Sequence, residues 1–171
     1  MPSPPSRRRL LRLVGASASV PLAGCTVSAF RSEEASSDPE YVDEADVVYE
    51  HEQLTLTVQP ETVRLGDRVE FELQNQGTSK FTLGCHNPWA LQRQTNDGWT
   101  HLTWTAEGYY DLCAFVLPAG EHTTVELKLS ESALTDVAAP LSGELQPGTY
   151  RFLILGTTPY LAVEFAVDES D

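Results

Sequence analysis

The 171-residue chain contains few lysines, one methionine and three cysteines. Each of these low counts limits the classes of partner or metal site that the protein can have. The lysines are Lys80 and Lys128, and the formal net charge is −14. Nucleic acid is therefore excluded as a partner, because a protein that binds it needs cations to neutralise phosphates. Scarce lysine with abundant Asp and Glu is typical of proteins that stay soluble in high salt, where charges are screened within about 3 Å at 1 M. We interpret this composition as halophilic, from an archaeal source, and the alternative is an ordinary acidic bacterial protein.

Long hydrophobic runs are also missing, since no stretch reaches the roughly 20 apolar residues that a membrane-spanning helix needs. The mildly apolar stretch 13–23 follows a basic start that contains Arg7 and Arg8, and it ends in Leu-Ala-Gly before Cys25. An arginine pair, an apolar run and small residues before a cysteine are typical of a twin-arginine (Tat) signal with a lipobox. We predict that 1–24 is a cleaved signal peptide and that Cys25 carries lipid.

The predicted lipid would hold the mature protein on the outer face of the cytoplasmic membrane, because two acyl chains give a stable anchor. Cleavage removes four of the 11 basic residues and none of the 25 acidic ones, which leaves 7 against 25 and a net charge of −18. Residues 25–46 are rich in Ser, Glu and Asp, so we expect a disordered acidic tether there. The remaining residues, 47–171, suffice for one folded domain but not for two.

Alternating apolar and polar residues fill this domain and predict half-buried strands. The runs are 54–58, 69–74, 81–83, 125–129, 150–154 and 161–165, with turn residues such as Asp97–Gly98 between strands. About seven to nine strands at this spacing predict an all-β fold, an antiparallel immunoglobulin-like β-sandwich. We expect Trp99 and Leu102 to pack inward beside Leu91, and only 130–134 to be helical.

The cysteines that remain after lipidation are Cys85 and Cys113, an even pair in an exported domain, where disulfides persist. We predict that they form a disulfide. The alternative is a cupredoxin-like metal or redox site. Its candidate ligands are Cys85, His86, His101, Cys113 and His122. A blue-copper site usually has an axial methionine, and the only one is Met1, inside the predicted signal, so we expect no metal and no other cofactor.

Catalytic motifs are not recognisable in the sequence, which lacks a Gly-x-Ser-x-Gly elbow and paired zinc-ligand spacings. We therefore expect a protein that is not an enzyme. Aromatic residues gather instead around a glycine-containing loop, where Trp104, Tyr109 and Tyr110 are the candidate binding surface. Core packing or shielding of the disulfide is the alternative role for these side chains.

Four short pieces of the domain carry a resemblance to a known family. They are Val69–Asn75, Leu91–Trp99, Leu117–Glu121 and Leu145–Phe152, of which the last holds the distinctive Leu-x-Pro-Gly-x-Tyr-Arg sequence. In this order they resemble a bacterial Ig-like domain family of surface lipoproteins. The resemblance implies a β-sandwich module without catalytic residues. Tyr150 is expected to point inward and to cap a nearby backbone group with its hydroxyl, while Arg151 faces outward.

Together these features predict a membrane-anchored extracytoplasmic lipoprotein that carries a non-catalytic module for binding, adhesion or an accessory role in the envelope. Its expected partners are the membrane, through Cys25, and another surface protein or envelope component.

Overall fold

The computed structural model describes residues 46–85, 87–105 and 114–169, which all belong to one compact unit. These residues form eleven strands and one short helix. The elements are β1 (Val47–Val48), β2 (Leu54–Gln59), β3 (Thr62–Arg64), β4 (Arg68–Asn75), β5 (Phe81–Leu83), β6 (Trp89–Thr95), β7 (Gly98–Trp104), β8 (Phe115–Leu117), β9 (His122–Lys128), α1 (Glu131–Thr135), β10 (Gly148–Ile154) and β11 (Tyr160–Asp168). Among the described residues, none forms a helix long and apolar enough to cross a membrane.

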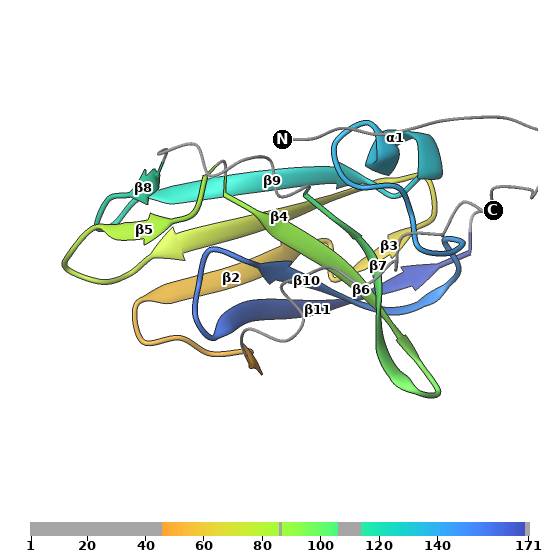
Figure 1. Cartoon of the computed structure of the whole chain (residues 1–171), viewed down its shortest axis with the longest axis horizontal. Helices are drawn as coiled ribbons and strands as arrows, with labels where there is room; N and C mark the ends of the chain where they lie inside the picture. Colours follow the sequence, from red (N-terminus) through yellow and green to blue (C-terminus); the bar gives the residue numbers. More distant parts are fainter. Residues whose placement is uncertain (1–45, 86, 106–113, 170–171) are drawn as a thin grey trace, which may run out of the picture. The chain divides into compact units, whose positions relative to one another are not determined.

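Two sheets and a two-stranded ribbon make up the domain (Figure 1). The large sheet has the order β1-β11-β10-β6-β7, with β3 also paired to β11; the small sheet is β2-β4-β9, and β5 pairs with β8. All pairings are antiparallel except those of β1 and β3 with β11. Seven strands have six residues or more, and in chain order they correspond to strands A, B, C, C′, E, F and G of an immunoglobulin-like domain. With these letters the small sheet has the order A-B-E and the long strands of the large sheet have the order C′-C-F-G, which is an immunoglobulin-like order. The predicted fold class is confirmed, and the remaining strands have three residues or fewer.

Phenylalanines from both sheets meet in the core between them. Phe71 of β4 stacks on Phe152 of β10 with ring centroids 3.9 Å apart, and Phe165 of β11 meets Phe71 edge-on at 5.3 Å. Such aromatic pairs add about 0.5–1.5 kcal/mol to the stabilisation from burial alone. The alternation in the three strands therefore places one apolar face of each sheet against the other.

Tyr150 caps the connection that enters β10. Its side chain is completely buried, and its hydroxyl donates a hydrogen bond to the Gln146 carbonyl at 2.5 Å. The same oxygen accepts a hydrogen bond from the Gln146 backbone N–H at 3.2 Å. The predicted inward position and capping role of Tyr150 are therefore confirmed, and they match the tyrosine corner of immunoglobulin-like sandwiches.

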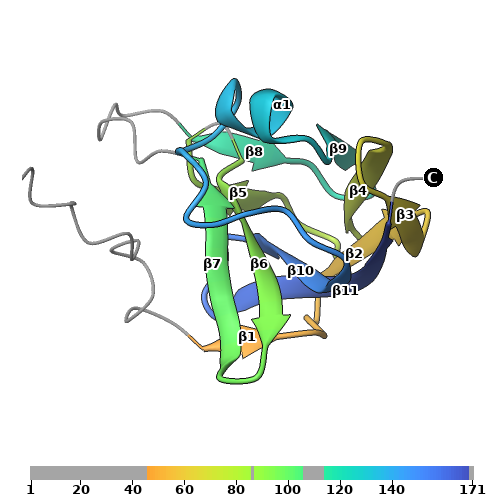
Figure 2. The same cartoon turned by 90° about the vertical axis from the view of Figure 1, so that its right-hand side faces the viewer.

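The β6–β7 hairpin turns at Asn96 and Asp97, as predicted, and its tip projects beyond the rest of the large sheet (Figures 1 and 2). A register shift between Leu91 and Gln92 makes Leu102 an extra residue in β7. Leu102 is buried in the core, as expected. Trp99, however, lies on the outer face against Arg151, so the expectation that it packs inward is wrong. Residues three apart in a strand point to opposite faces, so with Leu102 in the core Trp99 belongs on the outer face, and the expectation that both pack inward ignored this alternation.

The short helix α1 lies near the end of β9, in the place predicted for it. Leu134 is its buried residue and belongs to the main core. One turn of helix therefore closes the sandwich between β9 and the connection to β10.

Candidate functional site

A row of polar side chains crosses the outer face of the large sheet. It consists of His101 on β7, Gln92 on β6, Arg151 on β10 and Glu164 on β11, each the register partner of the next. Tyr49 follows β1 and reaches Arg151 from the opposite edge of the sheet. Five segments from three separate parts of the chain, the end of β1, the β6–β7 hairpin and the β10–β11 pair, thus contribute side chains to one surface.

Hydrogen bonds fix the orientation of Gln92, which is only 4% exposed. Its side-chain carbonyl oxygen accepts a hydrogen bond from Arg151 Nε. Because a guanidinium can only donate, the amide nitrogen of Gln92 must point the other way, and it lies 2.9 Å from His101 Nδ1. His101 Nε2 lies 3.2 Å from the same amide nitrogen, so both ring nitrogens of His101 are within hydrogen-bonding distance of Gln92.

Arg151 lies between two aromatic side chains. Its guanidinium carbon is 4.4 Å from the centroid of the Trp99 ring, which is a cation–π contact. Its Nη1 donates a hydrogen bond to the Tyr49 hydroxyl at 3.4 Å. Together with the bond to Gln92, these contacts hold the guanidinium over the middle of the sheet.

Tyr49 is half exposed, at 49%, yet its surroundings change its acidity. Burial raises the pKa of the phenol above its ordinary value of 10.0, and a hydrogen bond to Glu164 raises the pKa as well, while Arg151 acts in the opposite direction. The phenol is therefore protonated at neutral pH, and its hydrogen is available to the Glu164 carboxylate.

An apolar cluster continues the same outer face. Its buried members are Ala90, Leu153, Tyr160 and Ala162, against which Val47, Trp104 and Leu155 pack. Leu153 and Arg151 are two residues apart on β10 and so point to the same side. The outer face of the large sheet thus has an aromatic and polar half, next to an apolar half.

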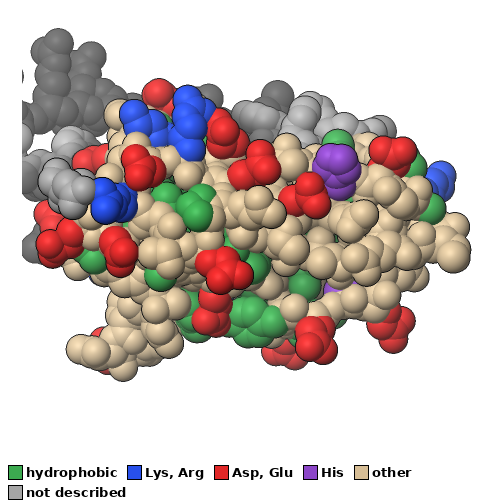
Figure 3. Space-filling view, turned by 180° about the vertical axis from the view of Figure 1, so that it is seen from behind, with side chains coloured by type: hydrophobic (Ala, Val, Ile, Leu, Met, Phe, Trp, Pro, Cys, Tyr) green, Lys and Arg blue, Asp and Glu red, His purple; other side chains and the backbone are tan. Residues whose placement is uncertain are grey.

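The outer face of the small sheet differs in composition from the outer face of the large sheet. An open depression there is lined by Gln59, Pro60, Arg68, Val69, Glu70 and Glu126. Arg68 and Glu126 form an ion pair with both side chains largely exposed. Figure 3 shows acidic side chains spread over the visible surface, in keeping with the net charge of −14. This surface is that of an ordinary solvated sheet.

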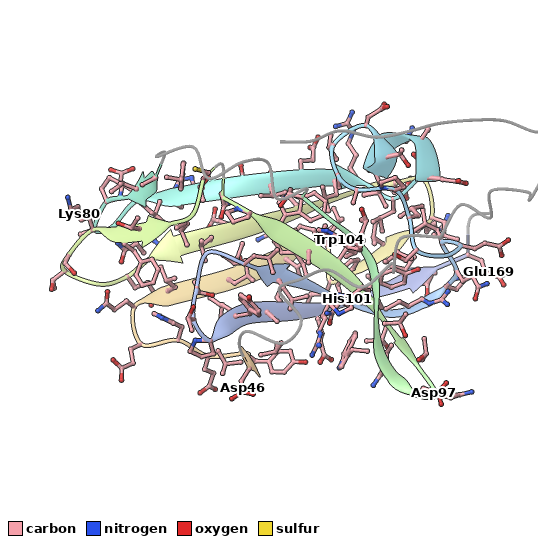
Figure 4. The ribbon with its side chains drawn as sticks, viewed as in Figure 1. Asp46, Lys80, Asp97, His101, Trp104 and Glu169 are labelled. Atoms are coloured by element: carbon pink, nitrogen blue, oxygen red, sulfur yellow. The ribbon has the colours of Figure 1, made fainter. Side chains whose placement is uncertain are left out.

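The predicted binding surface is described only at Trp104. This residue lies on β7 near His101, with ring centroids 6.5 Å apart in an edge-on arrangement (Figure 4). Tyr109 and Tyr110 lie outside the described residues, as do Arg7, Arg8 and Cys25. The roles predicted for these residues stay predictions.

The predicted disulfide and metal ligands are described in part. Cys85 is disulfide-bonded, while His86 and Cys113 are outside the described residues, so the pairing of Cys85 with Cys113 stays a prediction. His101 belongs to the large sheet and His122 begins β9 of the small sheet. In the part of the chain that the structure describes, no three His, Cys, Asp or Glu side chains come together as a metal site.

Sequence reasoning did not find the row on the outer face. Alternation did place Arg151 outward, and it set Glu164 apart from the apolar residues of its strand. The missing information was the pairing of β10 with β6 and of β11 with β1, since both depend on contacts between distant segments.

Comparisons with known proteins add no functional information. No family model and no curated protein matches the chain. One similar solved structure is the alkylpurine DNA glycosylase AlkC of Pseudomonas fluorescens bound to DNA, at 18% identity and a TM-score of 0.37, covering 67% of this chain and 30% of that one. Another is a β-glucosidase of Listeria innocua in complex with glucose, at 16% identity and a TM-score of 0.35, covering 67% and 16%.

A third similar structure is the CARDB domain of a Pyrococcus furiosus protein in complex with di-metal ions, at 12% identity and a TM-score of 0.28, covering 77% of this chain and 98% of that one. The chain spans less than a third of the length of the first two proteins. All of these TM-scores are below 0.5, so the similarities support no conclusion about this chain. The resemblance to the Ig-like lipoprotein family stays a prediction.

Proposed function

We propose that this chain is an exported lipoprotein, anchored to the outer face of the cytoplasmic membrane, whose β-sandwich is a non-catalytic binding module. The observation that carries the anchoring is the order of the arginine pair Arg7–Arg8, the apolar run 13–23 and the small residues before Cys25. These three parts are what export and lipid attachment require of a sequence.

We also propose that residues 25–46, of which only Asp46 is among the described residues, form a tether that gives the domain room to reach a partner. Residues 25–46 number 22, and a flexible chain of that length has a root-mean-square span of about 26 Å. Its acidic side chains repel one another and extend it further. The sandwich then stands clear of the lipid headgroups while it stays within a short distance of the membrane.

The support for a binding role is the composition of one surface. Tyr49, Trp99 and Arg151 come together on the outer face of the large sheet, and aromatic residues and arginine are the types enriched in binding surfaces. The outer face of the small sheet holds an exposed ion pair instead. We further propose that Cys85 pairs with Cys113, as the oxidising location of an exported domain favours.

Anchoring is tested by expressing the full chain in a halophilic archaeal host and separating membranes from soluble material. The wild type should remain in the membrane until detergent is added. Cys25→Ser should move to the soluble fraction, while the neighbouring control Thr26→Ala should stay in the membrane. A Cys25→Ser protein that sediments like the wild type would contradict the proposal. Hydrolase or redox turnover by the purified protein would contradict its non-catalytic part.

A further inference from the structure

We infer that the polar half of the outer face, formed by Tyr49, Trp99, Arg151 and Glu164, binds neutral sugar rings of an envelope glycan. This inference rests on the proposed function, in which the sandwich is a binding module, and adds to it the surface and the chemical class of the ligand.

The hydrogen-bonding groups of the site fit hydroxyls. Arg151 has five N–H donors, of which Gln92 and Tyr49 accept two, so three remain for a ligand. Its register partner Glu164 is exposed and offers only acceptors. A ligand that meets both residues must accept from one and donate to the other. Neighbouring hydroxyls on a sugar ring do both. A carboxylate on the ligand would be repelled by the Glu164 carboxylate, and an ammonium group on the ligand would be repelled by the Arg151 guanidinium.

The aromatic rings fit the apolar face of a sugar. Trp99 and Tyr49 reach Arg151 from strands on its two sides. The C–H groups of a pyranose ring carry partial positive charge, which the electron-rich face of an aromatic ring attracts. The Trp99 ring and the Tyr49 hydroxyl already contact Arg151, so less side-chain freedom is lost when a ligand binds.

The charge of the site favours a neutral ligand. Arg151 and Glu164 balance each other at the centre of the face, while the whole chain carries a net charge of −14. An acidic partner would be repelled by the chain as a whole. A basic partner would be drawn to the acidic side chains spread over the side seen in Figure 3 as well, so positive charge alone would not select this face.

The inference is tested with the full-length Cys25→Ser protein, titrated by calorimetry in molar salt with neutral hexasaccharides of glucose, mannose and galactose. We expect at least one to bind and to change the tryptophan fluorescence. Trp99→Ala and Arg151→Gln should each weaken that binding tenfold or more. Arg68→Gln is the matched control on the small sheet and should leave the affinity unchanged. Circular dichroism and melting of each variant establish that it is folded, and Trp99→Phe, which keeps a ring, should lose less affinity than Trp99→Ala.

A pull-down on native envelope material separates failure of this inference from failure of the proposed function. Binding that is lost after periodate treatment of the glycans and in the Arg151→Gln variant supports the sugar site. Binding that survives periodate but not protease overturns the sugar site and leaves a module that binds protein. Binding to neither the hexasaccharides nor the envelope overturns both proposals.

Discussion

The guanidinium of Arg151 lies 4.4 Å from the centre of the Trp99 ring, although β6 separates their two strands within the sheet. Trp99 comes just after the tip of the β6–β7 hairpin, where Figure 4 shows Asp97. The contact therefore ties the projecting hairpin to the middle of the large sheet. It also keeps the two side chains in the arrangement that the proposed sugar-binding surface needs.

Replacing Arg151 by methionine should destabilise the domain. The change removes a cation–π contact of about 0.5–1 kcal/mol and leaves the buried Gln92 oxygen without its donor, which costs about 1–3 kcal/mol. We expect a total loss of about 1.5–4 kcal/mol, measured by denaturant unfolding at constant salt. The control Arg68→Met breaks an exposed ion pair and should cost less than about 1 kcal/mol. Equal losses in the two variants would contradict the role of Arg151.

Replacing Tyr150 by phenylalanine should also reduce stability. The ring stays in the core, but the carbonyl and N–H of Gln146 both lose the hydroxyl that satisfies them. The expected cost is about 1–2 kcal/mol. Thermal and denaturant unfolding of the variant measure it, with Tyr49→Phe at the half-exposed position as the comparison. A Tyr150→Phe protein as stable as the wild type would mean that water replaces the hydroxyl at no cost.

The Tyr49 phenol should titrate above its ordinary pKa of 10.0, because burial and Glu164 both raise that pKa. Its contribution to stability is then complete below pH 10 and is lost as the pH rises through the higher folded-state pKa. Glu164→Gln should lower the pKa of Tyr49, and Arg151→Gln should raise it, as measured by NMR of labelled tyrosine. Shifts in the same direction for both variants would contradict the opposed effects of the two partners.

Dilution of salt should destabilise the domain. Its acidic side chains repel one another, and lowering the salt from 1 M to 0.01 M lengthens the Debye distance from about 3 Å to about 30 Å. We expect the melting temperature to fall steadily over this range. Added sucrose at low salt, which does not screen charge, serves as the control. A melting temperature that is the same in molar and millimolar salt would contradict the halophilic interpretation.

Local patterns were enough to predict the fold class and several individual positions. The Pro-Gly turn followed by alternating residues placed Tyr150 inward and Arg151 outward, because period two decides the face of each residue in a regular strand. The hairpin at Asp97–Gly98 was predicted for a similar reason, since its turn chemistry is local. Signals of this kind need no knowledge of distant strands.

Features that depend on pairing between distant segments were not predicted. The bulge at Leu102 leaves no recognisable pattern in the sequence and was not predicted. The parallel pairings of β1 and β3 with β11 join the two ends of the domain, and no local sequence pattern predicts them. The contact of Tyr49 with Arg151 follows from the first of these pairings. The grouping of Tyr49, Trp99 and Arg151 on one face could therefore be recognised only from the structure.

The central claim is that Cys25 anchors this sandwich to a membrane as a lipoprotein, and the mass of the N-terminal peptide of protein purified from host membranes tests it most directly. We predict a peptide that begins at Cys25 and carries lipid on the cysteine sulfur. A peptide that begins at Met1, or an unmodified Cys25, would contradict the claim.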